Sequence, residues 1–148
     1  MTTVNRNAIV PYTSAQMYAL VDDIVHYPEF LPWCGQAEEH ERTDEEVQAT
    51  LTLQWKGLHK SFTTRNRLHP HKIIEIRLVN GPFKHLEGFW RFVPLIEHGS
   101  ERGCKVELTL EFEFINHLMS LAFSKVFEQI SQQLVSAFSA RAAQVYGK

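Results

Sequence analysis

The acidic, histidine and cysteine residues of this chain are the ones whose chemistry could support catalysis or metal binding. Asp22 and Asp23 are adjacent in an expected helix, so their carboxylates point to different sides and cannot share a proton. The acidic residues from Glu38 to Glu46 are typical of a solvated hairpin. The sequence contains no Gly-x-Ser-x-Gly motif, no glycine-rich phosphate loop and no His-Glu-x-x-His motif. These patterns predict a protein that is not an enzyme.

Metal binding finds no better support in the sequence. His69 and His71 flank Pro70 in an expected turn, and no third ligand follows at a recognisable spacing. Cys34 and Cys104 are too few for a disulfide framework, so we expect both to be free thiols. The sequence therefore predicts no metal site and no required cofactor.

The composition is that of an ordinary globular protein. The chain has 148 residues, of which 44% are hydrophobic and 22% charged, and this length predicts a single domain over residues 1–148. Residues 1–6 contain no apolar segment of a secretory signal, and no apolar run is long enough to cross a membrane. We therefore expect a cytoplasmic protein.

Positive charge is concentrated in the middle of the chain. Between Lys56 and Arg91, eight basic and two acidic residues give a charge of +6, whereas the remainder carries −8. The basic residues expected on one surface are Lys56, Lys60, Arg65, Arg67 and Arg77. This surface either serves solubility alone or binds ribosomal RNA or an anionic membrane. Because no row of aromatic residues accompanies it, an RNA contact would be mainly to phosphate, and we expect no DNA binding.

Alternation of apolar and polar residues predicts about seven strands. The first covers residues 2–10 and the clearest covers residues 106–114, while weaker patterns cover residues 36–42, 47–55, 62–68, 74–78 and 86–92. A polar loop is expected at residues 97–103. The other connections are tight turns, so the neighbouring strands are expected to be antiparallel.

Two helices are expected beside these strands. Thr13 and Gln16 form a capping-box pattern that predicts a short helix, and a stiff corner with Pro28 and Pro32 follows, containing at most one helical turn at residues 29–31. A long helix is expected from its N-cap Asn116 to residue 146. Its apolar stripe is Leu118, Ala122, Val126, Ile130, Leu134, Phe138, Ala142 and Val145. An antiparallel sheet with one apolar face needs a cover, so we predict an α+β fold with a curved seven-stranded sheet wrapped around this helix.

The inward-facing side chains of this fold have two interpretations. They either pack into a solid core or line an apolar cavity that a lipid tail could occupy. Thr64 and Asn66 are the polar candidates for orienting a ligand head group, and Gly88 is expected to leave room beside two aromatic rings. The candidate cavity residues are Leu53, Trp55, Phe62, Thr64, Asn66, Ile74, Ile76, Leu86, Trp90, Phe92, Leu110, Phe112, Leu118, Ala122 and Val126.

Several local motifs accompany this order of elements. They are Val10-Pro11-Tyr12, Tyr27-Pro28-Glu29-Phe30-Leu31-Pro32 with Cys34, Phe62-Thr63-Thr64-Arg65-Asn66, Gly81-Pro82-Phe83-Lys84, Leu86 with Gly88 and Trp90, and Phe112-Glu113-Phe114. Together they resemble the START-like, helix-grip proteins of the coenzyme-Q-binding and polyketide-cyclase-related superfamily, and within it the ribosome association toxin branch. The resemblance covers essentially the whole chain.

This resemblance implies a helix-grip fold and one of two activities. The first is non-catalytic binding of a hydrophobic molecule, such as ubiquinone or another isoprenoid lipid, in support of respiration. The basic surface, and not the resemblance, suggests a peripheral membrane contact. The alternative is a toxin that binds the large ribosomal subunit and blocks subunit association. The resembled branch supplies no catalytic residues.

Overall fold

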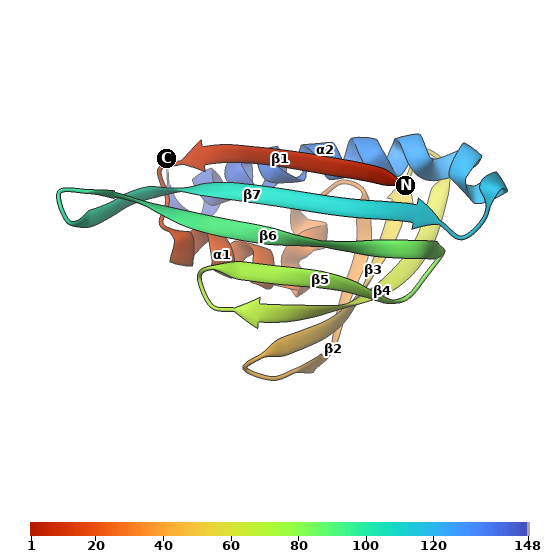
Figure 1. Cartoon of the computed structure of the whole chain (residues 1–148), viewed down its shortest axis with the longest axis horizontal. Coiled ribbons are helices and arrows are strands. Elements are labelled where there is room, and N and C mark those ends of the chain that lie inside the picture. Colours follow the sequence, from red (N-terminus) through yellow and green to blue (C-terminus); the bar gives the residue numbers. More distant parts are fainter. Residues whose placement is uncertain (148) are drawn as a thin grey trace.

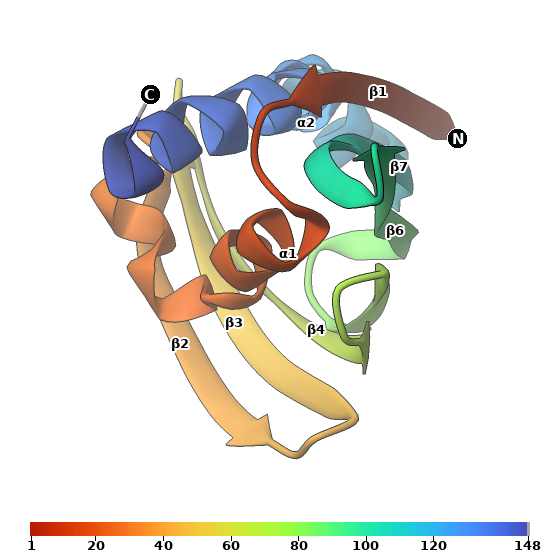
Figure 2. The same ribbon diagram turned by 90° about the vertical axis from the view of Figure 1, so that its left-hand side faces the viewer.

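The computed structural model describes residues 1–147 and contains one antiparallel sheet with helices against its concave face (Figures 1 and 2). The strands are β1 (Thr2–Val10), β2 (Cys34–Arg42), β3 (Glu46–Trp55), β4 (Leu58–His69), β5 (Ile73–Asn80), β6 (Phe83–Glu97) and β7 (Ser100–Phe114). Their order in the sheet is β1-β7-β6-β5-β4-β3-β2. The predicted α+β fold and its seven-stranded curved antiparallel sheet are confirmed.

The longest hairpin, β6–β7, is longer than the sequence predicts. The loop expected at residues 97–103 is wrong, because β6 continues to Glu97 and β7 begins at Ser100. The turn consists of His98 and Gly99, whose φ angles of 52° and 78° are both positive. Two residues with positive φ match the right-handed twist of paired strands, which lets this hairpin close tightly.

The short segment after β1 forms two helices. In α1 (Ser14–Asp22) the predicted capping box is present, because the Gln16 amide N–H donates to the Thr13 hydroxyl and the Thr13 N–H to the Gln16 side chain. A 3₁₀ helix, η1 (Ile24–Glu29), follows, so the expected single turn at residues 29–31 is wrong in position. This corner packs inward through Tyr27, whose hydroxyl donates to the Val21 carbonyl.

The long helix α2 (His117–Tyr146) begins and ends where the sequence predicts. The Asn116 side chain accepts a hydrogen bond from the Met119 N–H at 2.8 Å, and Gly147 ends the helix with a φ of 81°. The closest neighbours of α2 are β1, β7 and α1. Figure 2 shows the sheet beginning beside α2 at β1 and curving away from it through β6 and β4 to β2.

The buried face of α2 differs from the predicted stripe. Ile130, Phe138 and Ala142 are buried as expected, and they are joined by Phe127, Ser131 and Val135. Of the other predicted positions, Val126 and Leu134 are half-buried, whereas Leu118, Ala122 and Val145 are exposed. The first turns of α2 extend past the ends of β6 and β7 (Figure 1), so the sheet does not cover them.

Candidate ligand cavity

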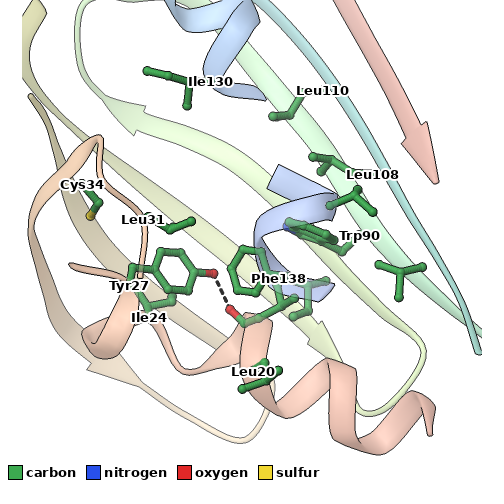
Figure 3. Close-up of a cluster of buried hydrophobic side chains, with 14 of the residues drawn as sticks. Leu20, Ile24, Tyr27, Leu31, Cys34, Trp90, Leu108, Leu110, Ile130 and Phe138 are labelled. Atoms are coloured by element: carbon green, nitrogen blue, oxygen red, sulfur yellow. Dashed lines mark hydrogen bonds between the residues drawn. The ribbon is translucent and has the colours of Figure 1, made fainter. Parts of the chain in front are cut away.

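An apolar cavity of about 80 Å³ lies between α2, the α1–η1 corner and the concave face of the sheet. Its wall consists of Val21, Ile24, Tyr27, Trp33, Ala49, Leu51, Phe62, Thr64, Asn66, Ile74, Ile76, Leu86, Trp90, Leu110, Phe127, Ile130, Ser131, Leu134 and Phe138. Figure 3 shows part of this wall, with Tyr27 and Ile24 from the corner, Trp90 and Leu110 from the sheet and Phe138 from α2. Every described layer of the fold therefore contributes to the cavity.

The position of α2 explains why this space is not filled. The backbone of α2 lies closest to β1, β7 and α1, while β4 and the β3–β4 turn reach the helix through side chains, Phe62 against Phe127 and Lys56 against Gln129. Large side chains from both sides fill most of the gap, but they leave the hollow beneath the middle of α2. The cavity thus follows from the curvature of the sheet.

Two aromatic clusters bound the cavity along α2. In the first, Phe127 lies with its ring centroid 4.7 Å from that of Phe112 and 5.0 Å from that of Phe83. In the second, Phe138 lies 5.3 Å from Tyr27 and 5.2 Å from Trp90. Eleven residues separate the two helical rings, a rise of about 16 Å at 1.5 Å per residue. Three of these four contacts are edge-to-face, an arrangement that aromatic pairs prefer, so the rings form two packed ends of the cavity.

The polar groups of the cavity wall are few and mostly engaged. The Thr64 hydroxyl donates to the Asn66 side-chain oxygen at 3.0 Å, and the Ser131 hydroxyl donates to the Phe127 carbonyl at 2.8 Å. Burial raises the pKa of the Tyr27 hydroxyl well above its ordinary value, so this group stays protonated. In the described chain, no Asp, Glu, His, Lys, Arg or Cys lines the cavity. The wall therefore offers no group that could exchange protons near neutral pH.

The structure brings together about half of the predicted cavity residues. Those that line the wall are Phe62, Thr64, Asn66, Ile74, Ile76, Leu86, Trp90 and Leu110. Leu53, Phe92 and Phe112 are buried in the core beyond the wall, and Trp55 is half-buried at the end of β3. Leu118, Ala122 and Val126 do not line the wall, because the helix presents Phe127, Ile130 and Ser131 there instead.

Sequence reasoning missed the cavity residues that have no simple periodic signal. The corner supplies Val21 and Ile24, which belong to the apolar stripe of the expected short helix, and Tyr27 and Trp33, which come from an irregular segment without a periodic pattern. Two other cavity residues, Ala49 and Leu51, could have been found from the sequence. They share the inward parity of Leu53 on β3, which the alternation of apolar and polar residues identifies. On α2, Ile130, Leu134 and Phe138 belong to the predicted stripe, whereas Phe127 and Ser131 lie beside it and follow from a small rotation of the helix.

The predicted basic residues divide into two groups. Arg65 and Arg77 lie directly opposite each other on β4 and β5, with Arg67 two residues along, on the convex face of the sheet. Acidic residues share this face, because Glu46 and Glu75 lie opposite Arg67 on its two neighbouring strands. The second group, Lys56 and Lys60, lies at the β3–β4 turn, where the Lys56 ammonium is 5.9 Å from the centre of the Trp55 ring. The convex face is therefore mixed in charge around a pair of arginines.

Both cysteines are free, as predicted, and both are buried. Desolvation raises the pKa of the Cys34 thiol and that of the Cys104 thiol to about 11.

None of the helices in residues 1–147 combines the length and the apolar character that a membrane crossing would need.

A curved antiparallel sheet that grips a C-terminal helix above an apolar cavity defines the START-like, helix-grip class. The chain belongs to the family described as polyketide cyclase / dehydrase and lipid transport, whose profile matches residues 10–139. A relative in Vibrio cholerae serotype O1, "Ribosome association toxin RatA", is 44% identical over 148 residues and covers 100% of both chains. The "Coenzyme Q-binding protein COQ10 homolog B, mitochondrial" of Xenopus laevis is 26% identical and covers 97% of this chain and 59% of its own.

Solved structures show the same fold. The Zhui aromatase/cyclase from a Streptomyces species superposes with a TM-score of 0.83, over 97% of this chain and 94% of its own, at 18% identity. At that identity the likeness shows the architecture, and the aromatase/cyclase activity is a property of that protein.

Proposed function

We propose that this protein binds a hydrophobic ligand, ubiquinone or another isoprenoid lipid, in the cavity under α2 and does no chemistry on it. The observation that carries this proposal is the wall of the cavity, which is apolar apart from a few neutral groups. Burial of apolar ligand surface contributes about 25 cal/mol per Å², and such a wall presents no charge that opposes it. The coenzyme-Q-binding name of the Xenopus relative supports the same ligand class.

The size of the cavity determines how such a ligand must bind. A volume of about 80 Å³ is smaller than the roughly 300–1,000 Å³ of typical small-molecule sites, so it holds only a short apolar group. A longer tail requires the wall to move. The side facing β3 to β5 is held less closely, because the backbone of α2 lies nearest to β1, β7 and α1 and meets β4 through the Phe62–Phe127 contact. We propose that the cavity widens there when the ligand enters.

The polar end of the cavity wall suits a quinone ring. The Asn66 side-chain oxygen already accepts from Thr64, which leaves the Asn66 NH₂ group to donate to a ligand carbonyl. Both residues lie on β4 beside Phe62, so the isoprenoid tail would extend from them toward the aromatic clusters.

The test is native mass spectrometry of the purified protein, with organic extraction of any bound lipid. We expect a bound quinone or other isoprenoid in the wild-type protein and its loss in Ala49→Leu. Ala49 lines the cavity, and the added side chain would fill it. Thr50→Leu is the matched control, because the next residue of the strand points to the opposite face. Wild-type protein that stays ligand-free after incubation with ubiquinone in detergent would refute the proposal.

The exposed end of α2 fits a role in lipid exchange. Leu118, Leu121 and Ile115 expose 77%, 73% and 57% of their surface, and Lys125 follows one turn later. Exposed apolar side chains next to a lysine are suited to shallow insertion into an anionic membrane surface. We propose that this end of the helix makes the peripheral membrane contact.

A second candidate function is association with the large ribosomal subunit, as a toxin-like inhibitor of translation. It is favoured by the name of the relatives that are over 40% identical across the whole chain, together with the arginine pair on the convex face. The test is co-sedimentation with large subunits after Arg65, Arg67 and Arg77 are all changed to Glu. We expect binding to be lost, while a control with Arg6, Arg102 and Lys125 changed to Glu retains it. Equal loss in both variants would show that only net charge matters and would reject this face.

A further inference from the structure

A histidine and two glutamates converge on the convex face of the sheet, on strands β6 and β7 (Figure 1). His85 and Glu87 are two residues apart on β6, so both point to the same face. Glu111 lies directly opposite Glu87 on β7. The ligand atoms of all three residues lie within 4.8 Å of one another. The cluster is on the opposite side of the sheet from the ligand cavity and does not depend on it.

The two paired glutamates, Glu87 and Glu111, would be stabilised by a nearby cation. Like charges directly opposite each other on neighbouring strands destabilise the pair. The nearby glutamates of β7 have their own cations, because Arg91 and Lys105 bind Glu107, while the N-terminal amine and Lys84 approach Glu113. Glu87 and Glu111 are different: within residues 1–147 the only ion-pair partner of either is the His85 ring.

The His85 ring does not satisfy these carboxylates by ordinary hydrogen bonds. Its Nε2 atom is shielded from solvent and has no hydrogen-bond partner in the described chain. It lies 3.4 Å from a Glu87 carboxylate oxygen and 3.6 Å from a Glu111 carboxylate oxygen, longer than the usual 2.7–3.2 Å of an N–H···O bond. Ligands that bind one ion tetrahedrally at about 2.0–2.2 Å are themselves about 3.3–3.6 Å apart. The two distances from the His85 Nε2 atom therefore match those between ligands of one ion.

From this geometry we propose that His85, Glu87 and Glu111 bind a divalent transition-metal ion, with Zn²⁺ as the natural occupant. One imidazole nitrogen and two carboxylate oxygens suit zinc, whereas calcium and magnesium favour oxygen ligands alone. Three protein ligands leave the fourth position to water or an anion. Glu87 and Glu111 also line an open hollow that Arg77 and Arg91 border, so an anionic group could reach the ion.

Bound zinc would change the convex face in two ways. It would join β6 to β7 through side chains, and it would offset the charges of two carboxylates beside the arginine pair. Glu87 lies opposite Arg77 on β5, so the offset would fall next to the basic group. The metal would thereby turn a face of mixed charge into one that favours anionic partners.

The test is calorimetric titration of chelator-treated protein with Zn²⁺ alone. We expect one ion per chain, and a loss of roughly tenfold or more in affinity for His85→Asn and for Glu111→Gln, since even outer-shell changes cost this much. His69→Asn is the matched control, because the His69 ring lies 2.6 Å from Glu75 on the same sheet but has no second carboxylate ligand. Its affinity should equal that of the wild type.

A second measurement keeps the result independent of folding. Zinc should shift the side-chain nitrogen resonances of His85 in the wild-type protein and leave those of His69 in place. The absence of saturable zinc binding, unchanged affinity in His85→Asn with a wild-type circular dichroism spectrum, or zinc shifts confined to other histidines would each overturn the proposal.

Discussion

The ring of Phe127 meets the ring of Phe112 edge-on, at a centroid separation of 4.7 Å and an interplanar angle of 79°. This contact joins α2 to β7, and Phe127 also packs against Phe62 and Phe83 from two other strands. A single helical side chain therefore binds three strands together at one end of the cavity. It is both a core residue and part of the cavity wall.

Replacement of Phe127 by Ala should test both roles. We expect a loss of about 3–5 kcal/mol in the free energy of unfolding, since a buried ring is removed from a close-packed cluster. The space should join the cavity, so binding of an apolar fluorescent probe should rise. Urea unfolding and probe titration measure the two effects.

Phe123→Ala is the control for this variant. Phe123 lies one turn earlier and is half-buried, and among the aromatic rings of residues 1–147 it approaches that of Phe114 alone, at 6.5 Å. We expect a loss of about 1 kcal/mol and no change in probe binding. Similar behaviour of the two variants would mean that Phe127 has no special place in the cavity.

The sequence predicts the elements of this fold well because each has its own local signal. The capping residues Thr13 and Asn116 sit where the structure uses them, and alternation identifies the inward residues of β4 and β7. The rotation of α2 about its own axis, in contrast, has no such local signal. Both Val126 and Phe127 are apolar, so periodicity cannot decide which one faces the sheet; packing against Phe83 and Phe112 decides it.

The cavity and the exposed helix end depend on distances that no local pattern contains. Tyr27 and Trp33 reach the cavity because the corner folds over the sheet, a tertiary arrangement that has no periodic signal. Leu118 is exposed because the first turns of α2 extend past the ends of β6 and β7, although its spacing matches the buried stripe. Likewise, His85 becomes a neighbour of Glu111 only through the register of β6 and β7.

Gly88 permits the close approach of two strands. A Cβ atom at this position would lie 2.0 Å from the Thr109 carbonyl oxygen and 2.9 Å from the Leu110 Cα, so the room it leaves is for backbone and not for aromatic rings. We expect Gly88→Ala to cost more than about 4 kcal/mol, because neither atom can move without breaking the β6–β7 pairing. Thermal unfolding measures the effect.

The control for Gly88 is Gly99→Ala in the β6–β7 turn. Gly99 has open space around its Cβ position but a φ of 78°, so only backbone strain of about 1–2 kcal/mol is expected. If the two variants were equally stable, the close approach at Gly88 would not limit the fold.

The two buried thiols predict a loss of stability at alkaline pH. The thiols of the unfolded chain ionise near pH 8.5, whereas burial raises the pKa of Cys34 and of Cys104 to about 11. The folded state therefore keeps protons that the unfolded state releases. The free energy of unfolding should be unaffected by these thiols below pH 8 and should fall between about pH 8.5 and 11.

Urea unfolding at several pH values measures this loss, and the variant with both cysteines changed to Ala should show a shallower decline. Thiol labelling at pH 8 supplies an independent readout, since both sulfhydryls should react slowly in the folded protein and rapidly in urea. Rapid labelling of the native protein would show that the thiols are accessible.

The exposed end of α2 allows the proposed membrane contact to be tested separately from the cavity. Changing Leu118 and Leu121 to Glu should abolish sedimentation with vesicles that contain anionic lipid, because the apolar side chains that insert are replaced by charges that the surface repels. Both residues are more than 70% exposed, so the free energy of unfolding should change by less than about 0.5 kcal/mol. The control variant changes Gln132 and Gln133, which are exposed farther along the same helix, to Glu. It adds the same charge and should leave vesicle binding intact. Loss of binding in this control as well would assign the effect to net charge, whereas a variant that binds vesicles like the wild type would exclude this end of the helix as the contact.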